Sequence, residues 1–181
     1  VYHGSNGARE MASSQNIVDA DYLTLYKIPV IAGRNFSGDY QTDNGKAYII
    51  NERLANELLK DEKGAKLESL IGKRFGFGGM DSAGSIIGIT KNFNFNSLHH
   101  KVETLCMMAQ RDWGYSEISV RLNSGNTNEA VRNIQDVWKK IVPDYPLDYK
   151  FLDQHMAELY KADQQVSEVV TILASLAIVI S

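Results

Sequence analysis

The stretch SEISVRLNSGNTNEAVRNIQDVWKKIVPDYPLDYKFL, residues 116–152, decides the predicted fold. Residues 116–122 alternate between apolar and polar side chains, a pattern typical of a strand with one buried face. Residues 127–142 instead gather apolar side chains on one helical face, and Pro143 ends that helix. This apolar stripe consists of Ala130, Ile134, Val137, Trp138 and Ile141. Because residues 147–152 again resemble a strand, the sequence predicts a β-α-β unit.

Two segments upstream each predict a strand followed by a helix. In residues 14–28, a short strand leads into one or two helical turns, which Asp19 or Asp21 could cap and which cannot continue through Pro29. In residues 46–60, the strand-like KAYIIN precedes ERLANELLK, which has an apolar helical face. That face consists of Leu54, Ala55, Leu58 and Leu59.

The region between these segments and the β-α-β unit is predicted to be rich in strands. Residues 73–77 and 84–95 carry β-branched and aromatic side chains on both sides of a glycine-rich turn, which predicts a hairpin. Residues 104–110 predict a further strand. The glycine-rich segment 76–84 lacks the Gly-Lys-Ser/Thr of a phosphate-binding loop, so we interpret it as a turn.

Composition narrows the classes of function. The chain of 181 residues has room for one domain or two small subdomains. A net charge of −3 and the lack of a basic run argue against a nucleic-acid partner. The single cysteine, Cys106, excludes an internal disulfide framework. The polar N-terminus has neither an initiator methionine nor the pattern of a signal peptide, so we expect the chain to be part of a longer protein.

The sequence contains no recognisable catalytic, cofactor-binding or metal-binding constellation. His99 and His100 are adjacent and would point apart, without a nearby cluster of cysteines or carboxylates. The aspartates of residues 39–45 do not have the spacing of a calcium loop, so we interpret that segment as a solvated loop. Cys106 has apolar neighbours, which is typical of a small buried hydrophobic residue. We therefore expect no catalytic residues, cofactor or metal in this chain.

The C-terminal segment predicts a helix that runs from Gln154 to Ser181 without glycine or proline. Its first part is amphipathic, whereas residues 169–181 are apolar on nearly every face. Thirteen helical residues rise only about 20 Å, and a bilayer core of about 30 Å needs about 20 residues. The pattern favours the beginning of a membrane helix over a core helix. The predicted membrane-entry residues are Val169, Val170, Ile172, Leu173, Leu176, Ile178, Val179 and Ile180.

Several blocks occur in an order that resembles the extracytoplasmic core domain of MacB-like ABC transporter permeases, which have FtsX-like membrane segments. VDADYLTLYKIPVIAGRNF (18–36) resembles the first block, with its Ile-Pro and Gly-Arg-x-Phe elements. YIINERLANELL (48–59), IGKRF (71–75) and SIIGITKNFNFNSL (85–98) resemble the following blocks. The β-α-β unit at 116–152 and the C-terminal helix complete the resemblance.

The resemblance implies an α+β fold with two parts and a long C-terminal helix that leads to the membrane. A porter-like part with β-α-β units would comprise residues 1–42 and 101–155, and it would be incomplete at its N-terminus. A smaller, β-rich, sabre-like part would comprise residues 43–100. Residues 156–181 would form the exit helix and the start of a transmembrane helix.

The resemblance also implies a non-enzymatic function at the bacterial inner membrane, on its periplasmic side. The domain would couple ATP-driven motion in the cytoplasm to substrate handling, efflux or signalling outside the membrane. Its partners would be a second permease copy, an ABC-type ATPase subunit or domain, the membrane itself and a periplasmic adaptor.

One alternative function is a ligand-binding sensor domain of a membrane receptor, which predicts a concave pocket. A second is an enzyme with an ordinary C-terminal core helix, which predicts titratable residues clustered in a cleft.

Overall fold

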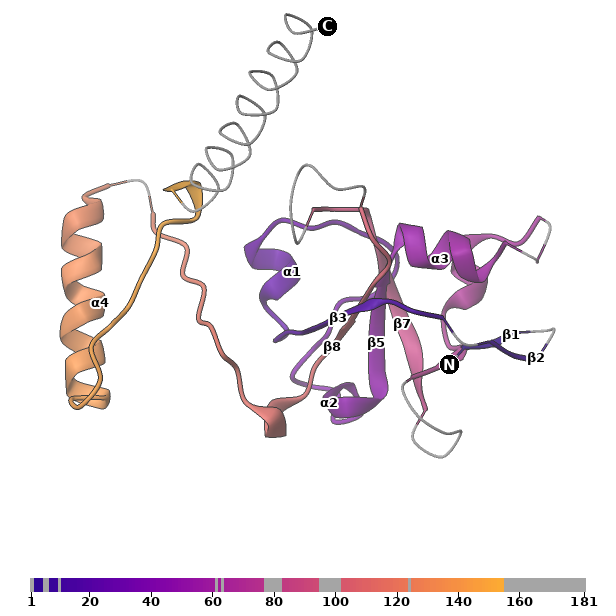
Figure 1. Cartoon of the computed structure of the whole chain (residues 1–181), viewed down its shortest axis with the longest axis horizontal. Helices are drawn as coiled ribbons and strands as arrows, with labels where there is room; N and C mark the ends of the chain where they lie inside the picture. Colours follow the sequence, from indigo (N-terminus) through magenta and orange to yellow (C-terminus); the bar gives the residue numbers. More distant parts are fainter. Residues whose placement is uncertain are drawn as a thin grey trace, which may run out of the picture. The chain divides into compact units, whose positions relative to one another are not determined.

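The computed structural model divides the chain into two compact units, unit 1 (Val1–Arg121) and unit 2 (Leu122–Ser181). Unit 1 contains a β-sheet with short helices, and unit 2 contains the longest described helix, α4 (Thr127–Ile141) (Figure 1). The structure describes residues 2–4, 7–9, 11–60, 62, 64–76, 83–94, 102–123 and 125–154.

The described part of unit 1 forms one mixed sheet of eight strands. The strands are β1 (Tyr2–Gly4), β2 (Gly7–Arg9), β3 (Ser14–Ile17), β4 (Val30–Gly33), β5 (Ala47–Asn51), β6 (Arg74–Phe75), β7 (Gly84–Thr90) and β8 (Leu105–Met108). The helical elements are α1 (Tyr22–Leu25), α2 (Asp43–Lys46), α3 (Glu52–Leu58) and the 3₁₀ turns η1 (Leu67–Leu70) and η3 (Arg111–Trp113).

Strand β5 lies inside the sheet, between β7 and β8 (Figure 1). It runs parallel to β7 and antiparallel to β8, and β8 pairs in turn with the parallel strand β3. The other edge of β7 pairs with both β6 and β4, each antiparallel. The β1–β2 hairpin extends the sheet from β6. Since α3 and η1 follow β5 in sequence, they form part of the crossover that a parallel β5–β7 pair requires.

Both faces of the sheet are covered at β5, so all five of its residues are buried. Successive side chains of a strand point to opposite faces. Tyr48 and Ile50 accordingly join one apolar cluster, and Ala47 and Ile49 join a second one. Helix α3 contributes Leu54, Ala55 and Leu58 to the first cluster. The second cluster also contains Val18, Leu23, Phe36, Leu105 and Met107.

Most of the predicted elements of unit 1 are confirmed. The strand–helix pattern of residues 46–60 forms β5 and α3, and the four predicted apolar residues of α3 and its end are buried. The predicted hairpin is the antiparallel pair β6–β7, and residues 104–110 contain β8. Asp21 is the N-cap residue of α1, but its side chain makes no capping hydrogen bond. The Asp19 side chain instead accepts a hydrogen bond from the Asp21 amide at 3.1 Å.

The helix of the predicted β-α-β unit is confirmed as α4, with its end one residue earlier than predicted. Asn126 caps it by accepting a hydrogen bond from the Glu129 amide at 3.3 Å. After Pro143 the chain returns, and the Trp138 indole donates a hydrogen bond to the Tyr145 carbonyl oxygen at 2.8 Å. The apolar stripe is only partly covered within the described residues, since Val137 is 53% and Ile141 is 73% exposed.

The two strands predicted at 116–122 and 147–152 are wrong. Neither segment forms a strand with any part of the chain that the structure describes, and Leu152 begins a helical turn. Alternation predicts which side chains share a face, but a strand also needs a neighbour for its backbone hydrogen bonds. Ile118 is 79% and Val120 is 58% exposed. The C-terminal helix predicted from Gln154 to Ser181 lies outside the described residues except for Gln154, which belongs to the helical turn that begins at Leu152.

Candidate functional site

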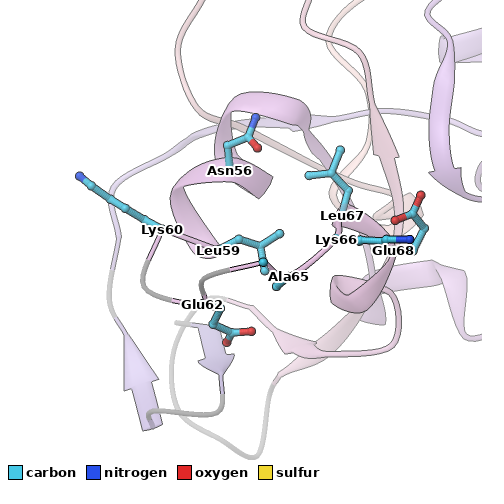
Figure 2. Close-up of a pocket in the computed structure, with 9 residues that line it drawn as sticks. Asn56, Leu59, Lys60, Glu62, Ala65, Lys66, Leu67 and Glu68 are labelled. Atoms are coloured by element: carbon cyan, nitrogen blue, oxygen red, sulfur yellow. The ribbon is translucent and has the colours of Figure 1, made fainter.

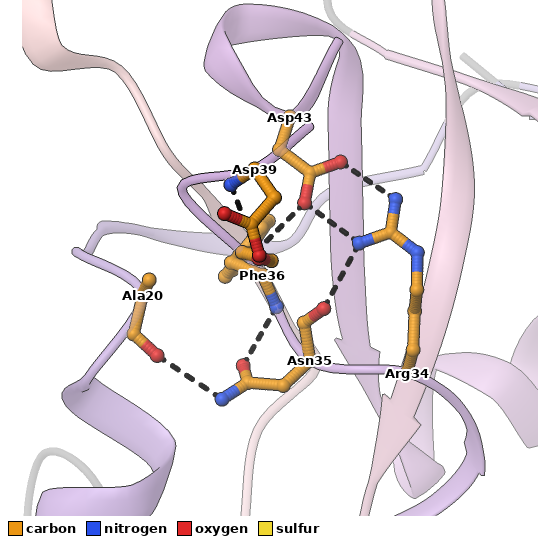
Figure 3. Close-up of polar contacts among 7 residues, drawn as sticks. Ala20, Arg34, Asn35, Phe36, Asp39 and Asp43 are labelled. Carbon is orange, nitrogen blue, oxygen red and sulfur yellow. Dashed lines mark hydrogen bonds and ion pairs between the residues drawn. The ribbon is translucent and has the colours of Figure 1, made fainter. Parts of the chain in front are cut away.

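A polar cluster of unit 1 joins the end of β4 to the start of α2. Arg34 and Asp43 form a bidentate ion pair, in which both guanidinium–carboxylate contacts are 2.7 Å (Figure 3). The Ser37 amide donates to the same carboxylate at 2.9 Å. The guanidinium also lies over the Tyr40 ring, 4.2 Å from its centroid. These contacts close residues 34–43 into a compact loop.

Asn35 connects this loop to the segment before α1. Its side-chain amide donates to the Ala20 carbonyl oxygen at 3.1 Å, and its oxygen accepts from the Phe36 amide at 2.8 Å (Figure 3). Phe36 itself is buried in the second apolar cluster. The loop is therefore held by polar contacts on its surface and by an apolar anchor beneath it.

The environment of Asp43 has opposing effects on the pKa of its carboxyl group. Burial alone would raise this pKa, because it disfavours the charged form. The hydrogen bonds from Arg34 and from the Ser37 amide, together with the charge of Arg34, lower the pKa below its usual value. The carboxylate is thus charged in the folded protein, although its side chain is only 4% exposed.

Asp43→Asn is expected to lower the free energy of unfolding by about 1–3 kcal/mol at neutral pH, because Arg34 loses its charged acceptor. The loss is modest because the Arg34 side chain is 38% exposed and solvent screens the pair. Because folding lowers the pKa of Asp43, its charged carboxylate stabilises the folded protein at any pH above its pKa in the unfolded chain, about 3.9. This stabilisation is lost as the pH falls through the pKa of Asp43 in the folded protein. The difference between wild type and variant should therefore shrink below about pH 4.

Urea unfolding followed by circular dichroism at neutral and acidic pH measures this difference. Asp39→Asn is the matched control, since Asp39 is exposed and belongs to the same loop, but among the described residues its side chain hydrogen-bonds only to Ser37. The control should change stability by less than about 0.5 kcal/mol. A loss for Asp43→Asn that stays constant from neutral to acidic pH would contradict the assignment of the charge.

Surface hollows lie at two places among the described residues of unit 1. The first, of about 250 Å³, adjoins the ion pair, with Asp43 in its wall. Phe36 is among its lining residues, together with polar and other aromatic side chains. The rim residues include Asp19, Asp21, Tyr40, Arg111 and Tyr115. Because ligand pockets usually measure about 300–1,000 Å³, this hollow is better suited to one side chain of a partner than to a free small molecule.

The second hollow, of about 640 Å³, lies between the end of α3 and η1 (Figure 2). Leu59, Ala65 and Leu67 contribute apolar surface to it, and these residues also pack against the first apolar cluster. Its rim alternates in charge through Lys60, Glu62, Lys66 and Glu68. Neither hollow is lined by a histidine or a cysteine among the described residues.

The predicted membrane-entry residues, from Val169 to Ile180, lie outside the described residues, as do His99, His100 and His155. In the part of the chain that the structure describes, no helix is both long enough and apolar enough to cross a membrane. Within the same residues, no group of three or more His, Cys, Asp or Glu side chains could hold a metal ion.

Cys106 is confirmed as a buried residue of β8, and its side chain joins the first apolar cluster. Burial raises the pKa of its thiol, since a thiolate is disfavoured among apolar neighbours.

A soluble disulfide reagent is therefore expected to leave Cys106 unmodified in the folded protein at neutral pH and to modify it fully in urea. Spectrophotometric titration of the thiol measures both states. Stoichiometric modification of the folded chain within seconds would contradict this burial.

The Arg34–Asp43 pair is the feature that sequence reasoning missed, because residues 39–45 were predicted to be a solvated loop. That prediction is wrong for Asp43, which is 3% exposed. The pair is nine residues apart and matches no helix or strand period, so no pattern marks the two residues as partners. The available signal was an arginine that follows a strand and precedes a loop rich in aspartate.

The comparisons with known proteins identify the family. Residues 1–136 match the family model described as the MacB-like periplasmic core domain. The match covers more than half of the chain, which therefore belongs to this family. A MacB-like periplasmic core domain is an extracytoplasmic domain of a protein in the ABC transporter permease family. A comparison with curated proteins found no match.

Two solved structures are similar to this chain. The periplasmic region of MacB from Actinobacillus actinomycetemcomitans has a TM-score of 0.49 and 13% identity, over 70% of this chain and 56% of that one. A domain of a protein described as a permease from Porphyromonas gingivalis has a TM-score of 0.45 and 18% identity, over 80% of this chain and 71% of that one. The aligned part of the chain thus spans 56% of the MacB periplasmic region.

Proposed function

We propose that the chain is the domain of an ABC transporter permease that couples motion driven by cytoplasmic ATP hydrolysis to substrate handling outside the inner membrane. The observation that carries this proposal is the family match over residues 1–136. The pattern of the following residues, amphipathic and then apolar, supports a link from this domain to the bilayer.

In this proposal the segment 154–181 is the mechanical link. It contains neither glycine nor proline, the residues that most often kink or weaken a helix. A continuous helix transmits a displacement along its axis, whereas a break absorbs it. The apolar residues from Val169 to Ile180 would enter the bilayer, with the rest of the domain on the periplasmic side of the inner membrane.

We also propose the division of the extracytoplasmic part into a porter-like part, residues 1–42 and 101–155, and a β-rich, sabre-like part, residues 43–100. Helix α4 lies in the first part, but the segments on both sides of it form no strand among the described residues. The β6–β7 hairpin supports the β-rich character of the second.

The proposed domain has no enzymatic role of its own. ATP hydrolysis would belong to a nucleotide-binding domain or subunit in the cytoplasm, and the permease would pair with a second copy or a relative. A periplasmic adaptor is a further proposed partner. The hollow beside Asp43 supports a surface that receives a partner side chain, because it combines exposed tyrosines with charged groups.

Val166→Pro tests the mechanical link in the full-length permease with its ATPase. Proline in a helix interior costs about 3 kcal/mol and breaks or kinks the helix, so the variant should hydrolyse ATP but lose most of its transport. Val166→Ala is the matched control, since it removes the same side chain and keeps the helix. A transport assay in a strain that lacks the gene, together with an ATPase assay, separates coupling from expression.

Two results would count against the proposal. Full transport by a well-expressed Val166→Pro variant would exclude a rigid helix as the coupling element. ATP hydrolysis by the purified chain 1–181 alone would contradict its non-enzymatic role.

A further inference from the structure

We draw no further inference here: the strongest candidate, the exposed apolar face of α4 in unit 2 (Val137 and Ile141), carries none because nothing in the structure shows what covers it.

Discussion

Gly33→Ala is expected to destabilise unit 1 by more than about 3 kcal/mol, because it combines backbone strain with a clash. Gly33 ends β4 with a φ of +72°, a conformation that favours glycine. An added Cβ would overlap the Ile87 carbonyl oxygen and would lie 2.9 Å from Ile71 Cδ1. The same Ile87 oxygen accepts the Arg34 amide at 2.9 Å. Relief of the overlap would therefore separate β4 from β7 and disturb the loop that begins at Arg34.

Gly72→Ala separates the two components of this loss. Gly72 has a φ of +82°, but nothing lies within 4 Å of an added Cβ. The control should therefore cost about 1 kcal/mol, which is the strain of a left-handed alanine alone. Urea unfolding of both variants, followed by circular dichroism, measures the difference. Equal losses would mean that β4 can move away from β7 at no cost, contrary to the packing at Ile87.

Sequence periodicity predicted the centre of the sheet because local pattern and tertiary environment agree there. Residues 46–60 read as a strand and a helix, and both sit against apolar clusters in the structure. The run Ala47–Ile50 lacks polar alternation, as expected for a strand that is covered on both faces. The resemblance of residues 18–36 and 48–98 to family blocks added the order of these elements, and the family match confirms that resemblance.

Periodicity failed where structure depends on a partner that is distant in sequence. Residues 116–122 alternate as clearly as any strand, yet the described residues offer no neighbouring strand for their backbone. The side chain of Ser119 instead bonds to the Tyr26 hydroxyl, 2.7 Å between the oxygens. A single-chain pattern contains no information on whether such a neighbour is present.

The Arg34–Asp43 pair was not predictable for a related reason. Loop contacts follow from the path of the backbone, which contains a glycine in positive φ, Gly33, directly before Arg34. Composition placed two aspartates in residues 39–45 but did not distinguish the one that is buried. Asp39 stays exposed and Asp43 is buried, although both are aspartates of one short loop.

Asn51 connects three elements of the sheet through one buried amide group. It is the last residue of β5 and the N-cap of α3, and its side chain is fully buried. The side-chain oxygen accepts from the amides of Leu54 at 2.9 Å and Leu105 at 3.1 Å. The side-chain nitrogen donates to the Glu103 carbonyl oxygen at 2.7 Å. The amide thus holds the start of α3 and the entry to β8 at the end of β5.

Asn51→Ala is expected to cost about 3–5 kcal/mol, from the loss of a helix cap, about 1 kcal/mol, and from backbone groups left unpaired, about 1–3 kcal/mol each. Asn92→Ala is the matched control, since Asn92 is exposed and makes one bond to the same helix, from the Arg53 amide at 2.9 Å. The control should cost less than about 1 kcal/mol.

Asn51→Asp distinguishes the cap from the link to β8. Aspartate can still accept both hydrogen bonds, so the cap of α3 remains. It cannot donate to the Glu103 carbonyl oxygen, and it places a charge in a buried site. At neutral pH this variant should be destabilised at least as much as Asn51→Ala. Since a protonated carboxyl group can donate, its deficit relative to wild type should shrink as the pH falls through the raised pKa of the new carboxyl group. If Asn51→Asp is as stable as wild type at neutral pH, the cap alone is important, and the bond to Glu103 contributes little to holding β8 against β5.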